Sequence, residues 1–204
     1  MPASRQIHPL LSNQPFTMIE GIQNPSLLSW NIREAPSTVL VRVNTVQPPR
    51  LLRSHELSAP ATRPPLTHLR IHCGIIPDSD TWYIETQNLS GVTVRNVLDA
   101  IYDAFKQPFS HESFNTLCPK TQTIVLNTFY ARVRAAGALD LSRAVWEEGI
   151  QRGDCLMRHS WFGGLSVSFE GRPDMENTCI LSVRRIDDEA NLPSPTRVVP
   201  SPFR

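Results

Sequence analysis

Polar side chains that could do chemistry alternate with apolar ones in two neighbouring stretches of the chain. This polar set comprises His68, Arg70, His72, Tyr83, Glu85 and Gln87. Successive residues of a strand point to opposite faces, so each stretch places its polar residues on one face. If the two stretches pair, the side chains form one patch. We therefore predict that the ligand-binding residues are His68, Arg70, His72, Tyr83 and Glu85.

Two kinds of chemistry are possible at this patch, and a third interpretation gives it no chemical role. Two histidines and a carboxylate could bind zinc, and a histidine with Glu85 could act as acid and base. The alternative is the solvated face of an antiparallel sheet, where polar residues belong in any case. Zinc sites usually contain histidines two residues apart or a CxxC pair, and the sequence has neither. We therefore predict no metal and no cofactor, assign no catalytic residue, and leave open whether the protein is an enzyme.

Other chemical signatures are weak. There is no GxSxG nucleophile motif. Cys118 precedes a predicted helix, where a thiol pKa can fall, although an ordinary capping thiol has the same placement. Asp99 and Asp103 share a helix face, either as paired carboxylates or as part of a solvated surface. The only adjacent glycines, Gly163 and Gly164, lack a phosphate-binding lysine. They are more typical of a turn or a bulge.

Composition excludes several classes of function. The 204 residues carry a net charge of +1, which gives no basic surface for nucleic acid. The amino-terminal segment has no apolar leader, and no apolar run reaches membrane-spanning length. The four cysteines are widely spaced, which favours reduced thiols. We expect an intracellular, cytoplasmic protein that binds neither nucleic acid nor membrane.

The elements that must position the patch surround one strongly patterned helix. Thr93 is the expected N-cap, and Pro108 ends the helix because it lacks an amide hydrogen. Ser110 then caps a short second helix. The apolar stripe of the first helix follows i, i+3, i+4 spacing: Val94, Val97, Leu98, Ile101, Tyr102 and Phe105.

The rest of the chain has weaker patterns. Period-two alternation predicts strands, and apolar stripes predict two further helices, the second capped by Asp140. The strands are expected over 37–44, 66–73, 82–87 and 178–186, the helices over 119–137 and 141–151, a loop over 47–65, and extended chain over 155–169. This order predicts an α+β fold: a mainly antiparallel sheet with three or four helices packed on one face. The domains are an extended arm over 1–26, the α+β domain over 27–186 and a proline-rich tail over 187–204.

Several short motifs recur in a fixed order between Ile7 and Val167. They are His8-Pro9-Leu10-Leu11, Leu28-Ser29-Trp30-Asn31-Ile32-Arg33, Ala61-Thr62-Arg63-Pro64-Pro65, Trp82-Tyr83-Ile84, Gly91-Val92-Thr93-Val94 and Phe162-Gly163-Gly164-Leu165. Together they resemble a domain family of unknown function from basidiomycetes, the mushroom-forming fungi. That family usually has an acidic residue where this chain has Asn31, and another where it has His159 after Arg158. The resemblance implies a fungal origin and one α+β domain, and it carries over no catalytic residue.

Two hypotheses of function follow. The first is a non-enzymatic protein-interaction module that binds a partner, or a second copy of itself, through a sheet edge or its proline-rich arms. The second is a small-molecule-binding protein or enzyme that uses the His68/Arg70/His72/Glu85 face. A deep pocket at that face favours the second hypothesis, and a flat, solvated face favours the first.

Overall fold

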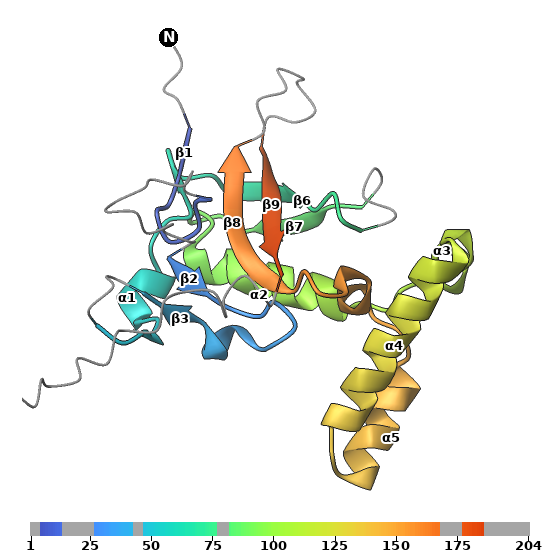
Figure 1. Ribbon diagram of the computed structural model, residues 1–204. Coiled ribbons are helices and arrows are strands. Elements are labelled where there is room, and N and C mark those ends of the chain that lie inside the picture. Colours follow the sequence, from blue (N-terminus) through green and yellow to red (C-terminus); the bar gives the residue numbers. More distant parts are fainter. Residues whose placement is uncertain (1–4, 14–26, 43–46, 77–81, 168–176, 186–204) are drawn as a thin grey trace, which may run out of the picture.

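The computed structural model of the chain describes residues 5–13, 27–42, 47–76, 82–167 and 177–185 (Figure 1). The strands are β1 (Gln6–Ile7), β2 (Leu28–Ser29), β3 (Leu40–Val41), β4 (Arg50–Leu51), β5 (Thr62–Arg63), β6 (His68–His72), β7 (Ile84–Gln87), β8 (Trp161–Val167) and β9 (Thr178–Arg184). The helices are α1 (Ser54–Leu57), α2 (Val94–Lys106), α3 (His111–Thr116), α4 (Pro119–Ala135) and α5 (Leu139–Glu148), with short 3-10 turns η1 (Pro36–Thr38) and η2 (Arg152–Leu156).

The largest sheet has four strands in the order β7-β6-β9-β8. The pairs β6–β7 and β8–β9 are antiparallel, whereas β6 and β9 run parallel. Two smaller antiparallel sheets join β1 to β5 and β2 through β3 to β4. The α+β class and the mainly antiparallel pairing predicted from the sequence are therefore confirmed.

Helix α2 forms as its sequence predicts. The Thr93 hydroxyl accepts a hydrogen bond from the Asn96 amide, and the helix ends at Lys106, before Pro108. Its apolar stripe is buried and packs along β7, and Ile84 and Thr86 of that strand also face the core. Ser110 caps α3, as predicted, by accepting a bond from the Ser113 amide.

The amino-terminal segment is attached to the domain by strand pairing and by buried leucines. Strand β1 pairs with β5, and the Leu165 amide donates to the Leu11 carbonyl. Leu10 and Leu11 are both buried, so this part of the amino-terminal segment packs into the core. The remainder of the predicted arm and the whole proline-rich tail lie outside the described residues.

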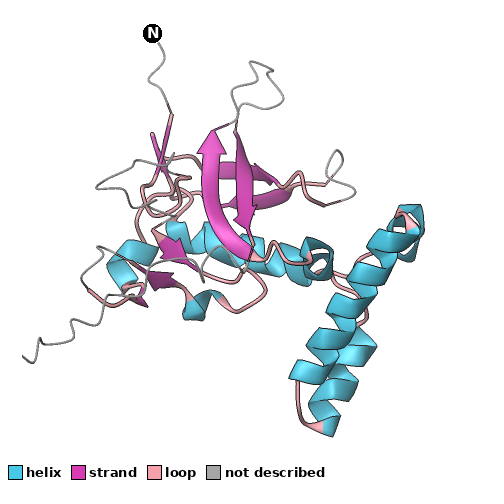
Figure 2. Ribbon diagram, viewed as in Figure 1, coloured by secondary structure: helices cyan, strands magenta, loops and turns pink. Residues whose placement is uncertain are grey.

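Helices α4 and α5 form an antiparallel hairpin that projects from the rest of the domain (Figures 1 and 2). They pack mainly against each other and against η2. The structure thus places α2 along the sheet and the α4–α5 hairpin beside it, whereas the sequence prediction gave every helix the same sheet face.

Some predicted elements differ from the structure. The stretch 37–44 begins with η1, because Pro36 starts a 3-10 turn, and only Leu40–Val41 is paired; residues 43 and 44 lie outside the described ranges. The predicted loop over 47–65 contains β4, α1 and β5. Part of the predicted extended segment over 155–169 is η2, and its strand begins only at Trp161.

The last predicted helix begins earlier than expected. Its N-cap is Ala138, so Asp140 lies inside the first turn rather than at the cap. Gly137, with φ 74°, occupies the left-handed conformation expected after the end of α4. The pair Gly163-Gly164 is a bulge, as predicted, because the β8–β9 register shifts between Phe162 and Gly164.

Candidate functional site

The predicted polar patch lies on one face of β6 and β7. Arg70 is directly opposite Glu85 in the register, and its Nε donates to Glu85 Oε1 at 2.9 Å. The same guanidinium lies 5.1 Å from the centre of the Tyr83 ring. Arg70 and Glu85 therefore neutralise each other on a part-exposed surface.

The two histidines of the patch differ in their surroundings. His68 is directly opposite Gln87 at one end of the strand pair, and His72 lies at the other end. The His72 and Tyr83 rings are 5.6 Å apart, and His72 Nδ1 is buried without a hydrogen-bond partner among the described residues. In that part of the chain no group of three or more His, Cys, Asp or Glu could hold a metal ion.

Among the described residues β7 is the last strand of its sheet, so no described strand pairs with its outer edge. The Asn88 amide donates to the Thr67 carbonyl, which makes Thr67 and Asn88 a hydrogen-bonded pair. Hydrogen-bonded and non-bonded pairs alternate along an antiparallel ladder. The backbone groups of Glu85 and Gln87 must therefore point away from β6, toward the open edge.

A bond on the other side of β6 supports this assignment. The Arg70 amide donates to the Asn177 carbonyl, so the Arg70 backbone faces β9 and cannot bond Glu85 opposite it. Both observations leave the amides and carbonyls of Glu85 and Gln87 without a partner in the sheet. Such a row of groups is a template for another strand.

A groove of about 440 Å³ runs between this edge and α2. One wall is formed by residues 82–87. The other wall is a helical stripe next to the buried one, with i, i+3, i+4 spacing: Asn96, Asp99, Ala100, Asp103, Ala104 and Gln107. The groove is open along its length, and its lining contains no lysine, arginine or histidine.

The groove is acidic. Asp99 and Asp103 lie one turn apart on the helix wall, whereas Glu85 on the strand wall is paired with Arg70. Partial burial raises the pKa of Asp99, the charge of Asp103 adds to the rise, and Arg95 opposes it. Sequence reasoning noted Asp99 and Asp103 as a helix-face pair, but it did not place them beside the β7 edge.

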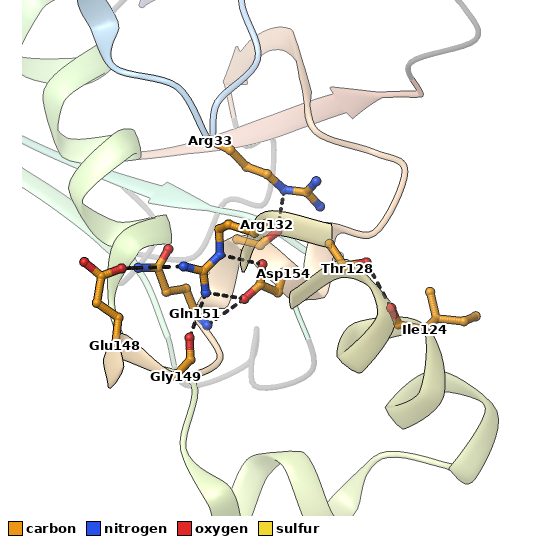
Figure 3. Close-up of polar contacts among 9 residues, drawn as sticks. Arg33, Ile124, Thr128, Arg132, Glu148, Gly149, Gln151 and Asp154 are labelled. Atoms are coloured by element: carbon orange, nitrogen blue, oxygen red, sulfur yellow. Dashed lines mark hydrogen bonds and ion pairs between the residues drawn. The ribbon is translucent and has the colours of Figure 1, made fainter. Parts of the chain in front are cut away.

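A second polar cluster joins the helical hairpin to the domain (Figure 3). Arg132 of α4 donates to both carboxylate oxygens of Asp154 at 3.2 and 2.9 Å, and also to the Gly149 carbonyl. The Gln151 amide donates to the same carboxylate. Arg33 donates to the Gly153 carbonyl on the other side of η2. All these charges have partners, and the cavity beside them measures only about 20 Å³, so the cluster is structural.

Sequence reasoning missed this cluster. Asp154 is only 1% exposed, yet nothing near it in the sequence indicates a buried carboxylate. The one local signal is the Gln151–Asp154 spacing, which the structure shows to be a capping box at the start of η2.

Cys118 is an exposed thiol, and hydrogen bonds from Thr121 lower its pKa. Its neighbours are the Thr121 hydroxyl and the Lys120 ammonium group, which do not form a nucleophile and general-base pair with it. The other three cysteines are buried, and none of the four forms a disulfide.

The fold and these surfaces can now be set beside known proteins. A family model described as "Family of unknown function (DUF6699)" matches residues 28–175. The match covers most of the chain, and the chain therefore belongs to this family. No curated protein and no solved structure matches it. The match confirms a family of unknown function, while the fungal origin implied by the resemblance finds no support in it.

Within the described residues, no helix combines the length and the apolar character needed to cross a membrane.

Proposed function

We propose that this domain is a protein-interaction module that binds an extended segment of a partner along the open edge of β7. The partner adds a fifth strand to the sheet and carries a lysine or arginine that reaches Asp99 and Asp103. The observation that carries the proposal is the outward orientation of the Glu85 and Gln87 backbone beside the groove.

The backbone edge supplies affinity. A strand laid along β7 can bond the amide and carbonyl of both Glu85 and Gln87. Strand addition to an exposed edge is a recurrent mode of peptide recognition, in which main-chain bonds bind and side-chain pockets select. At about 440 Å³ the groove is within the range of known ligand sites.

The helix wall supplies selectivity. Asp99 and Asp103 have no cation opposite them in the groove lining, so a basic side chain of the partner finds complementary charge there. An acidic partner segment would instead bring a like charge close to Asp99, whose pKa is already raised. The chemistry of the site therefore favours a basic, extended partner.

The test removes one outward amide and uses a control for the side chain that is lost with it. Proline at position 87 deletes the amide that faces the open edge and leaves the bonds to β6 intact. Gln87→Ala is the matched control, because it removes the same side chain and keeps the amide. Peptides are first selected from a random library displayed on phage, and the strongest binder is then synthesised.

The expected result is enrichment of peptides rich in lysine and arginine. Gln87→Pro then weakens binding of the synthetic peptide by about tenfold or more, equivalent to one or two lost hydrogen bonds, while Gln87→Ala changes it little. Equal binding by both variants, with both shown to be folded by circular dichroism, contradicts strand addition at β7.

A second candidate function rests on His72. Its buried, unpartnered Nδ1 and its contact with Tyr83 favour a small polar ligand on the His68/Arg70/His72/Glu85 face. Thermal unfolding against metals, nucleotides and common cofactors tests it. A ligand that stabilises the wild type but not His72→Ala against thermal unfolding supports this function. A ligand that stabilises both proteins shows that His72 is not part of the binding site.

A further inference from the structure

The projecting hairpin of α4 and α5 exposes an unusual amount of apolar surface. Among the described residues eight large hydrophobic side chains are exposed, and four of them lie on this hairpin: Tyr130, Leu139, Leu141 and Trp146. Leu139 is 89% exposed and Trp146 is 54% exposed. Apolar side chains gathered in this way on a monomer usually mark an interaction surface.

Three of these residues form one continuous face. The Trp146 ring stacks on Tyr130 across the two helices, with centres 6.0 Å apart and planes inclined by 19°. Leu139 and Trp146 are seven residues apart on α5, so they lie on the same side of that helix. We call the face formed by Tyr130, Leu139 and Trp146 the hairpin face.

The hairpin face has no covering layer within the described structure. No residue of α5 is fully buried, although its sequence is amphipathic. Helix α4 buries only Val125 and Phe129. Two helices alone leave part of each apolar stripe open, and four-helix bundles close it by packing two hairpins together.

The charges of the two helices indicate which kind of partner fits the hairpin face. Helix α4 carries Lys120, Arg132 and Arg134 and no acidic residue, whereas α5 carries Asp140, Glu147 and Glu148 against a single Arg143. Within the described residues Arg134 and Asp140 have no ion-pair partner, and they lie at the same end of the hairpin. Arg132 pairs with Glu148 and Arg143 with Glu147 within the chain, so the charges that a two-fold axis can oppose are Arg134 of one copy and Asp140 of the other.

We infer that the hairpin face binds a second copy of this chain. The two hairpins form a four-helix bundle in which Leu139 and Trp146 are buried, and Arg134 of each copy lies near Asp140 of the other. This surface is separate from the β7 edge, so the dimer leaves the proposed peptide groove free.

Sedimentation velocity over a concentration series tests the inference on the full chain. Leu139→Ser removes the most exposed side chain of the face, at the first position of α5, where serine is well tolerated. The matched control is Leu89→Ser, since Leu89 is 96% exposed on a turn that precedes α2. Leu139→Ser is expected to raise the dimer dissociation constant by about tenfold or more, and Leu89→Ser is expected to leave it unchanged.

A second set of variants tests the charge arrangement. Arg134→Glu is expected to weaken the dimer, and the double change Arg134→Glu with Asp140→Lys is expected to restore it. Circular dichroism checks that the helices persist in every variant. A wild-type chain that stays monomeric throughout the series overturns the inference, as does equal weakening by Leu139→Ser and Leu89→Ser. A dimer that Arg134→Glu leaves unaltered overturns the opposed-helix arrangement.

Discussion

Arg132 and Asp154 form a bidentate ion pair that joins α4 to η2. Arg132 Nη2 lies 2.9 Å from Asp154 Oδ2. The carboxylate is almost fully buried, and the Gln151 amide adds a third donor to it. A buried charge that loses its partner is costly, because the remaining ion cannot recover its hydration. The pair is therefore one of the contacts that attach the helical hairpin, together with the Arg132 bond to the Gly149 carbonyl and the buried Val125 and Phe129.

Replacing Asp154 with asparagine is expected to lower the free energy of unfolding by on the order of 2–4 kcal/mol. The change keeps the side-chain volume and leaves Arg132 with only its longer ion pair to Glu148, at 3.5 Å. Urea unfolding measures the loss. The control is Arg143→Gln, which breaks the exposed Arg143–Glu147 pair on the same hairpin and is expected to cost about 0.5 kcal/mol or less. Similar losses in the two variants would show that burial gives the Asp154 pair no special weight.

Glu56 gives a pH-dependent prediction. Its carboxylate accepts bonds from both terminal nitrogens of Arg50 at 2.8 and 2.7 Å and from the Arg53 amide at 2.8 Å. The Arg50 bond is the largest cause of a fall in the Glu56 pKa from 4.5 to about 2. Because the pKa is lower in the folded chain than in the unfolded chain, the pair stabilises the fold above about pH 4.5, and this contribution is lost as the pH falls toward 2.

Glu56→Gln is therefore expected to be less stable than the wild type at neutral pH. The difference in unfolding free energy should shrink between pH 4.5 and 2, where the wild-type carboxylate becomes protonated. Thermal or urea unfolding at several pH values measures the difference. A gap that stays constant across this range would mean that Glu56 acts through packing rather than through its charge.

Gly164 is a position where a side chain has no room. Its φ is 100°, and a Cβ there would lie 2.6 Å from the backbone of Asn13. Gly164→Ala is expected to destabilise the fold by about 2 kcal/mol or more, through backbone strain and overpacking. Gly74→Ala is the control, because the nearest atom to its Cβ is 3.8 Å away on the His72 ring. Hydrogen exchange should locate the damage at residues 11–13, and an unaltered segment there would contradict this contact.

The parts of the fold that the sequence predicted well are those fixed by local pattern. Helix α2 has a cap, a stop and a complete apolar stripe within a few residues of one another, and all three are confirmed. The alternation of polar and apolar residues in β6 and β7 indicated two neighbouring strands, whereas the register that places Arg70 opposite Glu85 came from the structure. These signals are short-range in the sequence, so they can be recognised without knowing how the rest of the chain folds.

The parts that the sequence missed depend on distant contacts. The last two residues of η2, 155 and 156, were expected to be extended, but they belong to a turn that Arg33 and Arg132 bind from opposite sides. The acidic groove forms only where α2 and the edge of β7 lie side by side. No sequence periodicity gives the distance between two such elements. The predicted site residues therefore remain a prediction, while the groove beside two of them, Tyr83 and Glu85, came from the structure.

Asp99 links stability to the proposed function. Burial raises its pKa in the folded chain, so its ionised form opposes folding at neutral pH. The charged groups that act on it are Arg95 and Asp103, both on α2, and Glu85 lies on the other wall of the groove. Asp99→Asn is therefore expected to increase the free energy of unfolding at neutral pH, and the gain should disappear as the pH falls through the raised pKa.

The same change should weaken binding of the selected basic peptide, because it removes charge from the groove. Opposite effects of one substitution on stability and on binding are typical of a residue retained for function. Glu112→Gln is the control, since it removes an exposed carboxylate on α3 that is not part of the groove lining. Urea unfolding and peptide titration measure the two effects. If Asp99→Asn and Glu112→Gln bind the peptide equally well, Asp99 contributes nothing to recognition, and the acidic wall of the groove is only a solvated helix face.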